Sequence, residues 1–119
     1  MLLRVSGQIT GAEVDMNTVN GDVQGDTGVA HAAELVAFTE AVLGTDEDML
    51  VSARAKLLRV VSPAAFVDAC ALIGAFNVVD RIADSTGIPL DDPIASMTEG
   101  LRTELDLVRF RSAENTLDR

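Results

Sequence analysis

Cysteine is almost absent from this chain of 119 residues, in which Cys70 is the one example. A single thiol excludes a disulfide within the chain. It also excludes a Cys-x-x-Cys redox pair or a cysteine-rich metal site formed by one copy alone. Two-cysteine redox chemistry is therefore beyond what this chain performs by itself.

Aromatic and basic residues are also scarce, with four Phe, no Trp, no Tyr and nine Lys and Arg against 19 acids. The chain lacks the aromatic side chains that stack on bases or cage a cation. Its formal net charge of −10 repels nucleic-acid backbones and anionic lipid. We therefore expect an aliphatic core and a protein that binds neither nucleic acid nor membranes.

The sequence also lacks an obvious hydrophobic run long enough to span a membrane. We expect no stretch to reach the length of about 20 apolar residues that a membrane-spanning helix needs. The opening MLLRVSGQIT carries Arg4 and lacks the apolar centre of a secretory signal. These features predict a cytoplasmic protein, and the length predicts one folded domain.

Residues 1–27 differ from the remainder because apolar and polar side chains alternate there. The stretch from Val5 to Gly28 holds five glycines, and Asn20-Gly21 lies between short β-friendly segments. This pattern favours an extended arm and is compatible with a weak β-hairpin. An isolated hairpin is marginal in water, so we expect the body or another chain to hold the arm.

Residues 28–119 are predicted to form one helical domain of about four helices in an antiparallel, bundle-like packing. The first helix has Asp26 or Thr27 as its N-cap and ends at Gly44. The next three begin at Thr45, at Ser62-Pro63 and at Asp92-Pro93, and the third ends at Gly87. The inner faces of the second and fourth helices are predicted to comprise Leu50, Ala53, Leu57 and Val61, and Ile94, Met97, Leu101, Leu105 and Val108.

The third predicted helix is apolar on nearly all sides. Between residues 64 and 79 only Asp68, Gly74 and Asn77 interrupt the apolar run. Such a helix is expected at the centre of a fold, with neighbours packed all round it. Cys70 lies in its middle, so we expect a buried, structural thiol rather than a reactive one.

The charged end of this helix is the first candidate site, a polar cluster of Asn77, Asp80, Arg81 and Asp84. These residues can share a helix face, where Arg81 would hold an anionic substrate and an Asp would accept a proton. The alternative is a helix end on which Arg81 pairs with a neighbouring group. We favour that structural interpretation.

Two further candidates have simpler explanations. His31 and Glu34 lie three residues apart, which suits a base and its orienting carboxylate, but no nucleophile accompanies them. The acidic runs 46–48 and 91–92 lie at predicted helix starts, where acids favour the helix dipole without a metal. We therefore expect neither a metal nor a cofactor.

The run LLRVVSPAAFVDACALIGAFNVVDRIADSTGIPL resembles carboxymuconolactone decarboxylase-like proteins, in their alkylhydroperoxidase D-like, peroxidase-related branch. That family carries Phe-Asn-x-x-Asn-Arg-x-Ala-Asp on a long helix, followed by Gly and an aliphatic-Pro step. The matching residues are Phe76, Asn77, Arg81, Ala83 and Asp84, and Asp80 replaces the usual Asn. The resemblance covers roughly residues 32–92.

The resemblance implies an all-α fold that assembles through helix packing, often into trimers or hexamers. It also implies a thiol peroxidase or decarboxylase ancestry. In the redox branch a Cys-x-x-Cys-x-x-x-His motif with an upstream Glu precedes the matched region, and residues 1–31 hold no cysteine. His31 follows Thr27 at the offset between the second cysteine and the histidine, so DTGVAH is open to interpretation as a worn remnant.

The sequence therefore predicts a non-catalytic or catalytically degenerate helical subunit. Its partners would be identical copies or other proteins, bound through helix packing and the N-terminal arm. One alternative is a peroxidase-like oxidoreductase subunit whose dithiol comes from another chain, with Arg81 at the interface. Another is a one-cysteine peroxidase that uses Cys70 and an external thiol.

Overall fold

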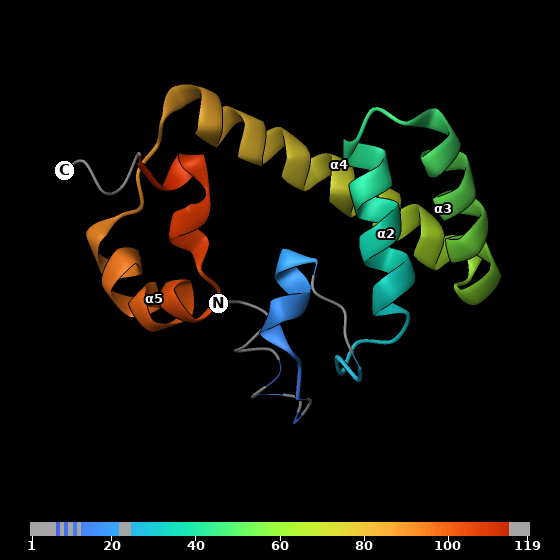
Figure 1. Cartoon of the computed structure of the whole chain (residues 1–119), viewed down its shortest axis with the longest axis horizontal. Helices are drawn as coiled ribbons and strands as arrows, with labels where there is room; N and C mark the ends of the chain where they lie inside the picture. The colour runs from blue at the N-terminus through green and yellow to red at the C-terminus, as the bar shows by residue number, and fades with distance from the viewer. Residues whose placement is uncertain (1–6, 8, 10, 12, 22–24, 115–119) are drawn as a thin grey trace.

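The computed structural model of the chain describes residues 7, 9, 11, 13–21 and 25–114, and seven helical segments lie between residues 16 and 113. They are the 3₁₀ helix η1 (Met16–Asn20), the α-helices α2 (Ala32–Leu43), α3 (Glu47–Val60), α4 (Pro63–Thr86) and α5 (Asp92–Glu104), and the 3₁₀ turns η2 (Leu107–Arg109) and η3 (Arg111–Ala113) (Figure 1). No strand occurs among the described residues. The predicted all-α class is confirmed.

The starts of α3 and α4 follow from their capping residues. The Asp46 carboxylate accepts a hydrogen bond of 2.9 Å from the backbone N–H of Met49. The Ser62 hydroxyl accepts one of 3.1 Å from the N–H of Ala65, and Pro63 follows it. Each cap satisfies a backbone donor that the first helical turn leaves unpaired. The predicted Ser62-Pro63 start is therefore confirmed, and α3 begins within two residues of its predicted start.

The start of α2 differs from the prediction. The helix begins at Ala32, about one turn after the expected start, because Gly28 and His31 have φ angles of 71° and 58°. Positive φ angles lie outside the right-handed helical region, so the chain cannot be helical through these residues. The prediction of Asp26 or Thr27 as N-cap is wrong, whereas the end beside Gly44 is confirmed.

The expected extended structure around Asn20-Gly21 is also wrong. Residues Met16–Asn20 form η1, whose first turn is capped by the Asp15 carboxylate, 2.9 Å from the N–H of Asn17. Gly21 ends η1 with a φ of 80°, a left-handed conformation that suits glycine. Most of the predicted arm before Glu13 lies outside the described residues.

The core lies between α2 and α3, which pack against each other, and the first half of α4. It comprises Phe38 and Ala41 of α2 with Ala53 and Leu57 of α3, all buried. Phe66 of α4 joins it, with its ring centroid 5.3 Å from that of Phe38. Partly buried side chains that pack against this core include Leu50 and Val61, so the predicted inner face of α3 is confirmed.

Beyond this core, α4 continues as a long rod toward the region of α5 (Figure 1). None of its 24 residues is buried, so the expectation of a central helix surrounded by neighbours is wrong. On the predicted seam of α5, Met97 is 64% exposed, whereas Leu105 just after the helix is buried. The predicted antiparallel packing of all four helices is not confirmed.

Candidate functional site

The two sides of α4 have different surroundings. Phe66, Ala69, Ile73 and Asn77 recur at spacings of three and four and are half-buried, and Phe66 and Ile73 pack against the core. These residues form one stripe of the helix, the stripe turned toward α2 and α3. The remaining positions are almost all exposed.

A second stripe of α4 points away from the core and is apolar over four turns. We call it the outer face, and it consists of Val67, Ala71, Gly74, Ala75, Val78 and Ile82. Its three large side chains are 62%, 60% and 55% exposed. A helix of a soluble monomer usually carries polar residues on such a side, so the outer face is a candidate interaction surface.

Further apolar side chains border the outer face. Leu72, Phe76 and Val79 are each about as exposed as Val67. By length and composition α4 even meets the criterion for a membrane-spanning helix, contrary to our expectation that no segment would. One such helix is weak evidence for a membrane span, and α4 carries charged residues toward its C-terminal end.

Gly74 lies in the middle of the outer face, and no contact within the chain requires a glycine at this position. A Cβ atom built at this position would meet no atom within 4 Å. Glycine in a helix interior costs roughly 0.5–1 kcal/mol of stability relative to alanine. Since the chain itself leaves room for a side chain, close approach of another molecule would explain the glycine.

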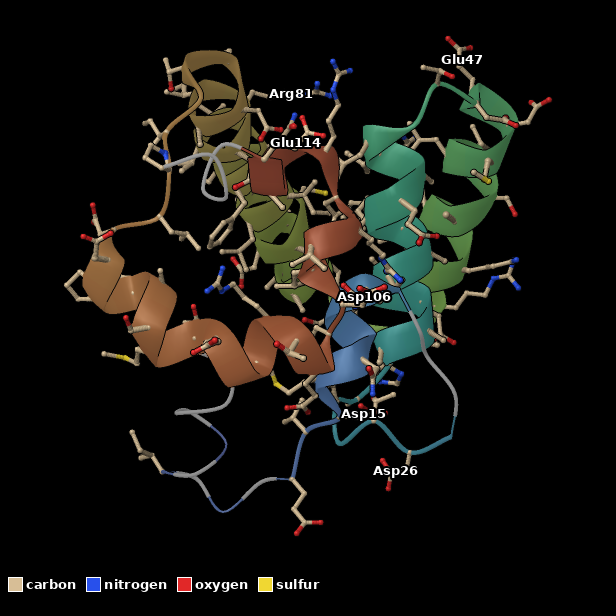
Figure 2. The ribbon with its side chains drawn as sticks, turned by 60° about the vertical axis from the view of Figure 1, so that its left-hand side comes forward. Asp15, Asp26, Glu47, Arg81, Asp106 and Glu114 are labelled. Atoms are coloured by element: carbon tan, nitrogen blue, oxygen red, sulfur yellow. The ribbon has the colours of Figure 1, made fainter. Side chains whose placement is uncertain are left out.

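The predicted polar cluster lies on the exposed second half of α4. Asp80, Arg81 and Asp84 are exposed, and Asn77 is half-buried. Arg81 donates from Nε to Asn77 Oδ1 at 3.4 Å, a long hydrogen bond within one turn. Figure 2 shows the Arg81 side chain extending beyond the ribbon of α4. The residues share a helix segment, but their exposure argues against an enclosed catalytic site.

Cys70 is exposed, and the expectation of a buried thiol is wrong. The error has the same origin as that for α4 as a whole, because we inferred burial from apolar neighbours along the helix. Ala69 and Ile73 are only half-buried and Ala71 and Leu72 are exposed, so a thiol reagent can reach Cys70 in the isolated chain.

The other proposed catalytic pair is not assembled into a site. His31 is exposed at the start of α2 and makes no side-chain capping bond, whereas Glu34 is half-buried one turn later. Thr27, which stands at the position of a thiol in the remnant interpretation, is buried. Its hydroxyl lies 3.3 Å from both the N–H and the carbonyl oxygen of Val29, so it stabilises its own turn.

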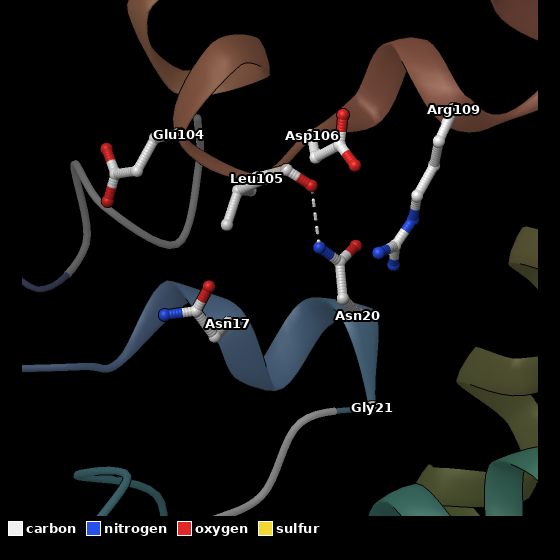
Figure 3. A pocket seen from close by; sticks show the side chains of 7 residues that line it. All are labelled: Asn17, Asn20, Gly21, Glu104, Leu105, Asp106 and Arg109. Atoms are coloured by element: carbon white, nitrogen blue, oxygen red, sulfur yellow. Dashed lines mark hydrogen bonds between the residues drawn. The ribbon is translucent and has the colours of Figure 1, made fainter.

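A polar cleft of 420 Å³ lies where η1 meets the segment after α5 (Figure 3). Asn20 donates from Nδ2 to the carbonyl oxygen of Leu105 at 2.8 Å and so connects the two segments. Residues lining the cleft are Asn17, Asn20, Gly21, Glu104, Leu105, Asp106 and Arg109.

The chemistry of this cleft is limited by its side chains. Arg109 can bind an anionic group, and its guanidinium also lies 4.9 Å from the Phe110 ring centroid. The lining residues include neither a nucleophilic thiol or hydroxyl nor a histidine. Among the described residues, no group of three His, Cys, Asp or Glu side chains is arranged to hold a metal ion.

No family model, curated protein or solved structure matches the chain. The resemblance to carboxymuconolactone decarboxylase-like proteins therefore rests on the residues between 32 and 92 that carry it.

Sequence reasoning missed both the outer face and the polar cleft. We did not predict the outer face because we assumed that an apolar helix is buried within its own chain. Its signal was present in the unexplained Gly74 and in the four-turn apolar spacing from Val67 to Ile82. The cleft had no comparable signal, because Asn20 and Arg109 are far apart in the sequence.

Proposed function

We propose that this chain is a non-catalytic helical subunit of a larger assembly and that α4 is the helix by which it assembles. The exposed outer face of α4 carries the proposal. Contiguous apolar surface of this kind marks interaction sites on soluble proteins. A partner laid on α4 would complete, between chains, the bundle-like packing that the sequence predicts within one chain.

The dimensions of the chain support this proposal. Its radius of gyration is 15.8 Å, whereas a compact domain of this length has one of about 13.5 Å. The extra extension lies along α4, which connects the α2–α3 core to the region of α5 (Figure 1). An elongated subunit with an apolar rod suits a structure completed by other chains.

The sequence adds two elements to the proposal. The resemblance to carboxymuconolactone decarboxylase-like proteins implies assembly through helices and offers an ancestry from which the redox motif has been lost. The acidic composition suits an assembly in the cytoplasm, with the N-terminal residues as a second region of contact.

The mass of the native protein, measured by light scattering after size-exclusion chromatography, tests the proposal. We expect a mass above the 12.5 kDa of one chain, and Val78→Asp should reduce it by burying a charge in the interface. Val51→Asp is the matched control, because Val51 of α3 is 61% exposed and Val78 is 60% exposed. A monomer that stays monodisperse at high concentration would refute the proposal.

Exposure of Cys70 favours a second candidate function, the one-cysteine peroxidase. Its thiolate would attack the O–O bond of a peroxide and become a sulfenic acid while water or an alcohol leaves. Two external thiols would then restore the thiol and form a disulfide between themselves.

Peroxide consumption in the presence of an external thiol tests this second function. Cys70→Ser would abolish consumption if Cys70 is the peroxidatic residue, whereas Arg81→Ala would leave it unchanged. Equal rates for the parent chain and the Cys70→Ser variant would eliminate the peroxidase and leave the assembly subunit as the function.

A further inference from the structure

The outer face of α4 is symmetric about the middle of its own helix. The helix runs from Pro63 to Thr86, so its midpoint lies between Gly74 and Ala75. Outward from this point come Ala71 and Val78, and then Val67 and Ile82, at equal distances on either side. The smallest residues are central and the largest are at the ends.

We propose that the outer face of α4 packs against the same face of a second copy of this chain, antiparallel, with the two-fold axis at Gly74 and Ala75. This inference rests on the proposed assembly function and specifies its partner. In this arrangement Ala71 of each copy lies opposite Val78 of the other, and Val67 lies opposite Ile82. A small residue therefore faces a larger one in the first pair, and two large side chains meet at each end of the face.

Gly74 supports this arrangement independently of the symmetry. Its missing side chain faces open space in the single chain. At a two-fold crossing, glycine and alanine allow two helix backbones to approach closely, as small residues do at other helix crossings. The residue that lacks a role within one chain thus acquires one between two chains.

The chain as a whole exposes more surface than a compact monomer. It exposes 8607 Å², whereas a compact monomer of its mass exposes about 6,200 Å². The surplus of about 2,400 Å² belongs to the whole chain, and burial of less than half of it on α4 would reach the roughly 1,000 Å² per chain at which obligate dimer interfaces begin. The apolar residues bordering the outer face belong to the same exposed surface.

Charge selects the antiparallel orientation over the parallel one. Asp68 is the one charged residue beside the first half of the outer face, and antiparallel pairing separates the two copies of Asp68 by about 20 Å along the helices. That separation exceeds the screening length of about 8 Å in physiological salt. Parallel pairing would place both copies at the same level.

The helix dipoles favour the same orientation. Antiparallel pairing places the positive N-terminal end of each α4 beside the negative C-terminal end of the other, whereas parallel pairing would bring like ends together.

Disulfide crosslinking in the full chain measures this register. In a Cys70→Ser background, Ala75→Cys places a thiol beside the axis, where we expect most of the protein to form a covalent dimer on mild oxidation by copper phenanthroline. Val67→Cys is the control, because its two copies would be about 22 Å apart along the helices and would not crosslink. Circular dichroism verifies the parent helix content of each variant, and a mixture of Ala71→Cys with Val78→Cys replaces Ala75→Cys if the latter is misfolded.

A mixture of two variants distinguishes the antiparallel register from every other one. Val67→Cys and Ile82→Cys should crosslink to each other when mixed and should not crosslink when each is oxidised alone. Crosslinking of Val67→Cys with itself would overturn the antiparallel arrangement and leave the assembly function intact.

Other occupants of the outer face would give other results. An assembly without any of these crosslinks would overturn self-pairing, and the face would belong to another protein. A monomer that floats with neutral phosphatidylcholine vesicles, again without crosslinks, would assign α4 to a membrane. That last outcome would refute the assembly function as well.

Discussion

Two neighbouring helices, α3 and α4, begin with equally good caps and differ in what their exposed sides carry. The exposed side of α3 holds charged residues, among them Glu47, Arg54 and Arg59. The exposed side of α4 is apolar from Val67 to Ile82. Helix formation is therefore decided locally in both helices, whereas burial is not. The chain covers the apolar side of α3 itself and leaves that of α4 exposed.

The largest change in the free energy of unfolding is expected in the core between α2 and α3. Phe38 is 2% exposed, and Phe38→Ala should lower the free energy of unfolding by about 3–5 kcal/mol through lost burial and a cavity. It would also remove the ring contact with Phe66, which joins α4 to the core. Urea denaturation monitored by circular dichroism measures the change.

Val42→Ala on the same helix is the control for this first prediction. Val42 is 38% exposed, and its truncation should cost less than about 1 kcal/mol. Equal costs for Phe38→Ala and Val42→Ala would show that the α2–α3 core does not dominate stability. The contrast between a self-covered α3 and an uncovered α4 would then fail.

A smaller change in the free energy of unfolding is expected for the N-cap residues of α3 and α4. Asp46→Ala at the start of α3 and Ser62→Ala at the start of α4 each remove one bond to a backbone N–H, and each should cost about 1 kcal/mol. Urea denaturation at one fixed protein concentration compares them. A cost for Asp46→Ala alone would mean that the start of α4 is not folded together with α3, and would widen the difference between the helices.

A similar or slightly smaller loss of stability is expected where the segment after α5 contacts η1. Asn20→Ala removes the 2.8 Å bond to the Leu105 carbonyl and should cost about 0.5–1.5 kcal/mol. Hydrogen exchange should quicken around residues 105–110 and stay unchanged in α3. Faster exchange throughout α3 would indicate that the two regions form one cooperative unit.

Much of the fold could be predicted from the sequence because helix ends are encoded locally. Ser62, Pro63 and Gly87 mark the ends of α4 by their own hydrogen bonds and backbone angles, without help from distant residues. The start of α2 could not be predicted in this way. It depends on the left-handed angle of His31, which a non-glycine residue rarely adopts.

The candidate site was less predictable for a different physical reason. Exposure of Cys70 and of the outer face depends on which elements pack together, and hydrophobicity along the chain does not specify the molecule that provides the cover. The same reasoning applies to the cleft, where Asn20 and Leu105 are 85 residues apart. Periodicity identified the apolar helix correctly but does not show whether the same chain covers it.

The smallest effect is expected for the polar cluster of α4, and it decides between a helix end and a working site. Arg81 is exposed, and its bond to Asn77 is 3.4 Å long, so Arg81→Ala should change the free energy of unfolding by less than about 0.5 kcal/mol. The native mass should also stay the same, because Arg81 lies beside the outer face and not within it. If Arg81→Ala dissociates the assembly as Val78→Asp does, the interface extends to the charged end of α4. The two helices would then differ in that the charged residues of α3 face solvent, whereas those of α4 also contact the partner.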